Sequence, residues 1–121
     1  TTPGVLVYRL YAPLIFANAR HVAERLRVLA AAAQPPLRCL VLDLQAVTQI
    51  DVTALAQLRD LYEDLEARGV DVRFARVNRP LREQLVQWLG DHRFGTERFF
   101  PSASAAVDDF LAGWRPPPDA R

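Results

Sequence analysis

The sequence predicts an α/β domain with a mixed, mostly parallel β-sheet and helices packed against it. Short apolar runs typical of strands alternate with longer segments in which apolar residues recur every three or four positions, as in amphipathic helices. The run from Cys39 to Leu44 is almost continuously apolar, which indicates a central strand covered on both faces. Two earlier runs, Val5–Leu10 and Leu14–Phe16, lie too close together for a helical crossover, so we expect the first two strands to be antiparallel.

Two helices are expected in the first half of the chain. Asn18 is a candidate N-cap for the first, whose apolar positions at helical spacing are Val22, Leu26, Leu29 and Ala33. The pair Pro35-Pro36 ends it, because proline cannot continue the hydrogen-bond ladder. The second helix begins near Asp51 and carries one apolar stripe, formed by Leu55, Leu58, Leu61, Tyr62 and Leu65. Gly69 supplies its left-handed exit.

The second half repeats this alternation. A strand over 70–77 leads to a third helix opened by Asn78, and a short strand near 98–100 precedes a last helix capped by Ser102. The residues after Trp114 are Arg-Pro-Pro-Pro and a few polar positions, a composition typical of polyproline conformation. We therefore expect a folded domain over 1–114 and a Pro-rich, disordered tail over 115–121.

Composition excludes several classes of function. The 15 cationic residues, all Arg, nearly balance 14 acidic ones, and a net charge of +1 argues against nucleic-acid binding through bulk electrostatics. With one cysteine, Cys39, no internal disulfide can form, and its apolar neighbours predict a buried structural thiol. No apolar run approaches the roughly 20 residues that span a bilayer, so we expect a soluble piece. An opening of Thr1-Thr2 without Met suits either a processed protein or a fragment of a longer one.

The segment Asp51-Val52-Thr53 is the first candidate site. Backbone N–H groups at a helix start lack partners, and the helix dipole favours negative charge there. Asp51 is therefore expected to cap the helix, with Thr48 as a competing cap three residues earlier. Thr53 then lies on the first turn, where it is either an ordinary helix-start residue or a hydroxyl whose phosphate would be stabilised by the helix end.

Several ordered motifs resemble the STAS domain, the module shared by anti-sigma factor antagonists and sulfate-permease-type (SulP) anion transporters. The antagonists read Asp-Ser-Ser-Gly-Leu, with the second Ser phosphorylated, where this chain has Asp51-Val52-Thr53-Ala54-Leu55. The opening 3–10, the stretch Pro-Leu-Ile-Phe-Ala-Asn-Ala over 13–19, and the stretch 68–77 resemble the transporter branch. The resemblance extends from about Gly4 to Phe110. The chain departs from the antagonist pattern at Val52 and Ala54.

The resemblance implies a non-catalytic cytoplasmic regulatory or interaction domain of an anion transporter. It implies that Asn18, Asp51 and Thr53 form an interaction surface, with Thr53 matching the phosphoacceptor. The implied partners are the transmembrane domain of the parent transporter, at the cytoplasmic face of the inner membrane, and cytosolic regulatory proteins. The alternative is a stand-alone antagonist-like phospho-switch protein. Nucleotide binding is a third hypothesis, against which stands the lack of a Gly-rich phosphate cradle.

The other reactive residues do not suggest an active site. His21 and His92 are far apart in the sequence and lack ligand spacing, so no metal or other cofactor is expected. Cys39 lies inside an apolar strand without identifiable oxyanion donors, which argues against an enzyme. The cluster Arg73, Arg76, Arg79 and Arg82 is either a solvated face or a contact for an acidic partner or membrane headgroups.

Overall fold

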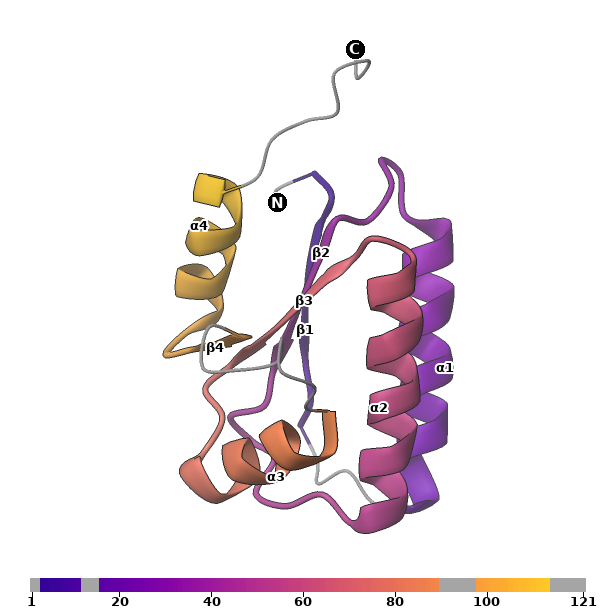
Figure 1. The fold of residues 1–121 in the computed structure, drawn as a ribbon. Coiled ribbons are helices and arrows are strands. Elements are labelled where there is room, and N and C mark those ends of the chain that lie inside the picture. Colours follow the sequence, from indigo (N-terminus) through magenta and orange to yellow (C-terminus); the bar gives the residue numbers. More distant parts are fainter. Residues whose placement is uncertain (1–2, 12–15, 90–97, 114–121) are drawn as a thin grey trace.

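Strands and helices alternate along the chain, as the sequence predicts. The computed structural model describes residues 3–11, 16–89 and 98–113 (Figure 1). The elements are, in order, β1 (Val5–Arg9), α1 (Phe16–Ala32), β2 (Cys39–Asp43), α2 (Val52–Ala67), β3 (Asp71–Ala75), α3 (Arg79–Leu89), β4 (Phe99–Phe100) and α4 (Ala103–Gly113). The predicted tail over 115–121 lies outside the described residues.

The four strands form one sheet in the order β1-β2-β3-β4, and every neighbouring pair is parallel. Val5 of β1 is in register with Cys39 of β2, which in turn is in register with Asp71 of β3. The prediction that the first two strands are antiparallel is therefore wrong. β1 and β2 are joined through α1, and a helical connection returns the chain in the same direction.

The antiparallel prediction depends on a second strand at the apolar run Leu14–Phe16. Phe16 is the first residue of α1, and residues 12–15 lie outside the described part of the chain. A short apolar run has too few residues to distinguish period 2 from period 3.6, so a strand and a helix start look alike. The same shift moves the start of α1 ahead of Asn18, which lies within the first turn and is not the residue before the helix.

Helices cover both faces of the sheet. α1 and α2 lie side by side on one face, α4 lies on the other, and α3 lies near the start of α2 (Figure 1). Because side chains alternate along a strand, Leu40 and Leu42 of β2 point into the large core beneath α1 and α2. Cys39 and Val41 point into a smaller core, which α4 closes with Ala106 and Phe110. All five residues of β2 are buried, which confirms it as a central strand.

Polar residues begin three of the helices at the predicted positions. The Asp51 carboxylate accepts a hydrogen bond from the Ala54 amide at 2.8 Å, and Asn78 accepts one from the Leu81 amide at 2.8 Å. Ser102 caps α4 in the same way, at 3.0 Å from the Ala105 nitrogen. Each cap satisfies an amide that would otherwise lack a partner.

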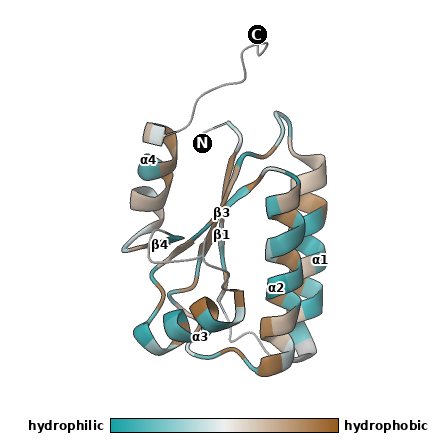
Figure 2. Ribbon diagram, viewed as in Figure 1, coloured by the Kyte–Doolittle hydropathy of each residue, from teal (hydrophilic) through white to brown (hydrophobic). Residues whose placement is uncertain are grey.

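The predicted apolar stripe of α2 faces the core, with Leu55, Leu58 and Leu65 buried. Figure 2 shows the alternation of hydrophilic and hydrophobic residues along α1 and α2 that this arrangement requires. Gly69 has a φ of +83°, the left-handed conformation predicted at the helix exit.

Candidate functional site

The predicted site residues lie at the carboxyl edge of the sheet. Parallel strands place all their carboxyl ends at one edge, and the helix that follows each strand begins there. α1 follows β1, and α2 follows β2, so Asn18 and Thr53 both occupy the first turn of a helix at this edge. Figure 1 shows these two helix starts next to one another below the sheet.

A small cavity confirms that the two first turns are neighbours. It has a volume of about 10 Å³ and is lined by Ala19 and Ala54, the residues that follow Asn18 and Thr53. Small side chains at both positions allow the two helices to approach closely at this end. The structure thus brings Asn18, which is partly buried, to the same region as Asp51 and Thr53.

The start of α2 separates an exposed side from a buried one. Val52 is 61% exposed and Thr53 is exposed, whereas Ala54 and Leu55 are buried against the core. Thr53 therefore lies on the first turn, as the sequence predicts, and its side chain is exposed. Asp51 holds this turn through its bond to Ala54 and is itself exposed. The surface offers a hydroxyl and a carboxylate at a helix N-terminus.

Sequence reasoning missed a charged cluster at the same edge. Asp43, the last residue of β2, is 1% exposed and pairs with two arginines. Its Oδ2 lies 3.1 Å from Nε of Arg76, just after β3, and 3.3 Å from Nε of Arg9, at the end of β1. We call Arg9, Asp43 and Arg76 the carboxyl-edge triad. One side chain from each of three neighbouring strand ends meets there.

The pKa of Asp43 reflects competing effects. Burial raises this pKa, but the hydrogen bond from Arg76, the bond from the Gln45 amide and the charges of Arg76 and Arg9 outweigh burial and lower it below its ordinary value. The carboxylate is therefore charged at neutral pH. The pKa of Arg76 is raised chiefly by its hydrogen bond to Asp43, against the effect of burial.

The backbone at Arg76 is unusual. Its φ is +57°, in the left-handed region that residues with a Cβ rarely adopt. Such conformations persist only where the surrounding structure imposes them, and here the paired contact with buried Asp43 holds the side chain. A signal existed in the sequence, because Asp43 is the one charged residue in the apolar run 39–44. Its partners could not be identified, since register alone brings Arg9 and Arg76 to it.

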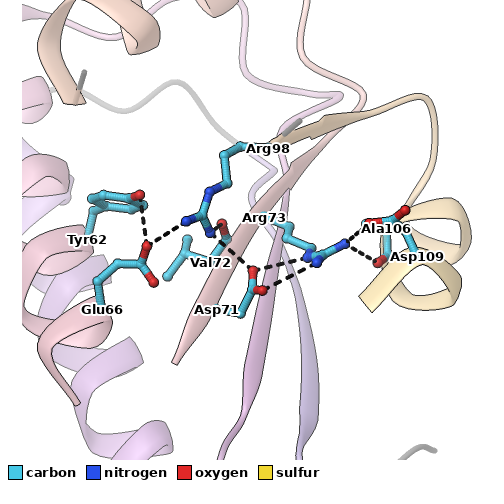
Figure 3. Close-up of polar contacts among 8 residues, drawn as sticks. All are labelled: Tyr62, Glu66, Asp71, Val72, Arg73, Arg98, Ala106 and Asp109. Carbon is cyan, nitrogen blue, oxygen red and sulfur yellow. Dashed lines mark hydrogen bonds and ion pairs between the residues drawn. The ribbon is translucent and has the colours of Figure 1, made fainter. Parts of the chain in front are cut away.

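A second polar network lies at the other end of β3 (Figure 3). The network consists of Tyr62, Glu66, Asp71, Arg73, Arg98 and Asp109, and we call it the α2–α4 network. Arg98 donates to Glu66 at 2.9 Å and to Asp71 at 3.2 Å, and Arg73 donates to Asp71 at 3.0 Å. Arg73 also pairs with Asp109 of α4 and donates to the Ala106 carbonyl at 3.3 Å. The network ties α2, β3 and α4 together.

The four arginines of the predicted cluster lie in three different places. The Arg73 guanidinium, at 13% exposure, lies 5.2 Å from the ring centroid of Phe100 and 5.5 Å from that of Phe110, so it closes the small core. Arg76 belongs to the carboxyl-edge triad, and Arg79 and Arg82 lie on α3. Arg73 and Arg76 are thus each engaged in ion pairs with different carboxylates and are not a shared solvated face.

The other candidate reactive groups are placed as structural residues. Cys39 is fully buried, and burial, with the nearby charge of Asp71, raises the pKa of its thiol to about 12. A thiol of this kind is not a nucleophile at neutral pH. Within residues 3–11, 16–89 and 98–113, no group of three His, Cys, Asp or Glu side chains could hold a metal ion. His92 lies outside these ranges.

The length and composition of the described helices can be compared with what a membrane-spanning helix requires. In the part of the chain that the structure describes, none of them has the length and apolar character required to cross a bilayer.

Fold and site together define a small α/β module whose predicted site residues lie at helix starts along the carboxyl edge of a parallel sheet. The chain belongs to the STAS domain family, whose family model matches residues 1–106. The expected family is thereby confirmed.

Curated relatives are sulfate transporters. The chain is 36% identical over 110 residues to a "Probable sulfate transporter" of Mycobacterium tuberculosis strain H37Rv, covering 89% of this chain and 19% of that protein. It is 30% identical over 115 residues to "Sulfate transporter 1.3" of Arabidopsis thaliana, covering 88% of this chain and 17% of that one. The chain thus spans less than a fifth of the length of these two relatives.

Solved structures share the fold. The SulP transporter STAS domain from Vibrio cholerae superposes with a TM-score of 0.75 at 24% identity, covering 93% of this chain and 85% of that one. The murine Solute Carrier 26 family member A9 anion transporter gives 0.77 at 22% identity, covering 93% of this chain and 18% of that one. The anti-sigma factor antagonist SpoIIAA in its unphosphorylated form gives 0.67 at 13% identity, covering 94% of each chain.

Proposed function

We propose that this chain is the non-catalytic regulatory and interaction domain of a sulfate-permease-type anion transporter. The observation that carries the proposal is the pattern of coverage, in which nearly all of this chain matches less than a fifth of two sulfate transporters. The contribution of this chain to such a protein would be to regulate transport or assembly through contacts with other parts.

The proposed contact surface consists of Asn18, Asp51 and Thr53. Two of these side chains are exposed on the start of α2, and the third lies on the neighbouring start of α1. The backbone around Asp51 and Thr53 is fixed by the Asp51 cap, so a partner would meet a preorganised helix start there. The proposed partners are the transmembrane domain of the parent transporter and cytosolic regulatory proteins, at the cytoplasmic face of the membrane.

We propose that the domain performs no chemistry and needs no cofactor for this role. Its cysteine is buried with a raised pKa, which supports a packing role for Cys39. The buried carboxylate of Asp43 is paired with two arginines and remains charged, so it is unsuited to act as a general acid at neutral pH.

The deciding experiment introduces Thr53→Glu into the parent transporter. The substitution places a bulkier, charged group on the proposed surface, and we expect reduced transport with normal protein abundance. Ser104→Glu is the matched control, because Ser104 is also an exposed hydroxyl residue at the second position of a helix, on the opposite face of the sheet. Equal effects of the two variants would contradict the proposed surface, and a parent protein without membrane spans would contradict the transporter role.

A phospho-switch protein is the second candidate function. The exposed Thr53 hydroxyl at the position that matches the antagonist phosphoacceptor supports it. Phosphorylation would add about −1.5 to −2 charge units at this surface and alter docking. Intact-mass measurement after incubation with cell extract and ATP tests it. A single phosphate that disappears in Thr53→Ala would support the switch, and an unchanged mass would oppose it.

A further inference from the structure

The carboxyl-edge triad lines a small cavity that the proposed docking role does not use. The cavity has a volume of about 60 Å³, and its lining includes all three triad residues together with Tyr11 and Gln45. A buried water molecule needs a cavity of about 10–15 Å³, so this cavity has room for several water molecules. Its volume is too small for a nucleotide and is comparable to that of a small ion.

The charge of this cavity is positive. Two guanidinium groups face one carboxylate, which leaves one formal positive charge among the triad residues. Arg76 alone contacts Asp43 through Nε and Nη2, and the Gln45 amide adds a bond to Oδ1 at 3.1 Å. The carboxylate is therefore already well satisfied without Arg9. Arg76 alone balances the charge of the Asp43 carboxylate, so Arg9 is an additional positive charge at this cavity.

Arg9 has donors that no residue in the described part of the chain uses. It approaches Asp43 through Nε, and its terminal nitrogens donate no hydrogen bond to any residue that the structure describes. Its side chain is 55% exposed, so a ligand from solvent can reach these nitrogens. Tyr11, which is 81% exposed and carries a phenolic hydroxyl, also lines this cavity. Guanidinium donors in a fork, with a hydroxyl beside them, match the geometry of an oxyanion.

We propose that this cavity binds a small tetrahedral oxyanion such as sulfate, held by Arg9 and Arg76 and supported by Tyr11. The ligand would neutralise the charge left over by Asp43 and lie at the carboxyl ends of three neighbouring parallel strands. Asp43 would hold the Arg76 guanidinium through its oxygens, while its negative charge competes with the ligand for the two arginines; Asn at this position keeps an acceptor oxygen and removes only the charge. The proposal rests on the triad and its cavity alone, so it stands or fails independently of the proposed transporter role.

The test is an NMR titration of the isotope-labelled chain with sodium sulfate, at constant ionic strength maintained with a bulky organic anion. Saturable shifts at the amides of Gln45 and Arg76 in the millimolar range are expected. Arg9→Gln should weaken binding roughly tenfold, because one charge-assisted contact is lost while the Arg76–Asp43 pair is retained. Arg20→Gln is the matched control, since Arg20 is exposed on α1 and pairs with Glu24 outside the cavity.

Asp43→Asn provides a second test, in which the expected change in sulfate affinity is opposite to that of Arg9→Gln. It removes the carboxylate that competes for the two arginines, so a folded Asp43→Asn protein should bind sulfate more tightly, whereas a purely structural triad would show no gain. Methyl phosphate serves as a separate arm. If it binds more tightly than sulfate, the oxyanion site stands and its ligand is a phosphate carried on a larger molecule. Shifts that do not saturate, or equal weakening by Arg9→Gln and Arg20→Gln, would overturn the proposal.

Discussion

The two faces of the sheet are closed by different means. The face beneath α1 and α2 is sealed by a large apolar core, which includes the fully buried Leu40, Leu55 and Leu65. The face beneath α4 has a much smaller core, and the α2–α4 network completes it through Arg73. Apolar burial scales with area, whereas an ionic network depends on the geometry of a few groups. The comparison predicts that the first face governs global stability and the second governs how firmly α4 is attached.

The largest expected effect comes from breaking the first face. Leu58→Ala removes a buried side chain between α1 and α2 and should lower the free energy of unfolding by about 2–5 kcal/mol. Urea unfolding followed by circular dichroism measures this change. Unfolding of the variant should remain one cooperative transition of the whole domain, shifted to a lower urea concentration. A loss below about 1 kcal/mol would show that the large core is not the main source of stability.

A smaller and more local effect is expected on the second face. Arg73→Ala removes the contacts with Asp71, Asp109 and the Ala106 carbonyl, together with packing over two aromatic rings, and should cost about 2 kcal/mol. Hydrogen exchange should accelerate first in α4, because the network attaches that helix. Asp109→Asn is the control. Asp109 is 61% exposed, so its loss should cost about 0.5 kcal/mol or less. Equal acceleration in α1 and α2 would contradict a separately attached α4.

Acid should reduce the stability that Asp43 contributes at the carboxyl edge, whereas at neutral pH this contribution is fully present. Because the pKa of Asp43 is lower in the folded protein than its ordinary value of 3.8, its charged form stabilises the fold above that value. This contribution is lost as the pH falls below 3.8 and through the folded-state pKa. Unfolding free energies measured across this range should decline less steeply in Asp43→Asn than in the unchanged protein. Parallel declines would show that other carboxylates control acid stability.

The smallest effect on stability is expected at the proposed docking surface. Thr53→Glu places a carboxylate on the exposed first turn of α2, near the positive end of the helix, and should change stability by about 1 kcal/mol or less. Its melting temperature should remain close to that of the unchanged protein while partner binding weakens. If Thr53→Glu unfolds the domain as readily as Leu58→Ala, Thr53 is a structural residue and the surface assignment is wrong.

The sequence by itself determined the features that depend on local pattern. The apolar run at Cys39 predicted the buried central strand, and the leucine stripe of α2 predicted the larger core. Caps at Asp51, Asn78 and Ser102 were predictable because each satisfies an amide only three residues away. The family resemblance likewise followed from short motifs in a fixed order, and the STAS family model confirms it.

Tertiary structure alone decided what depends on strand pairing. The all-parallel sheet could not be predicted, because a short apolar run at Leu14–Phe16 fits a strand and a helix start equally well. The carboxyl-edge triad joins residues 33 positions apart, at Asp43 and Arg76, and brings Arg9 to them from a third strand. The network around Arg73 likewise spans α2, β3 and α4. Such contacts depend on which elements pack together in space, and they join residues too far apart in the sequence for a local pattern to reveal them.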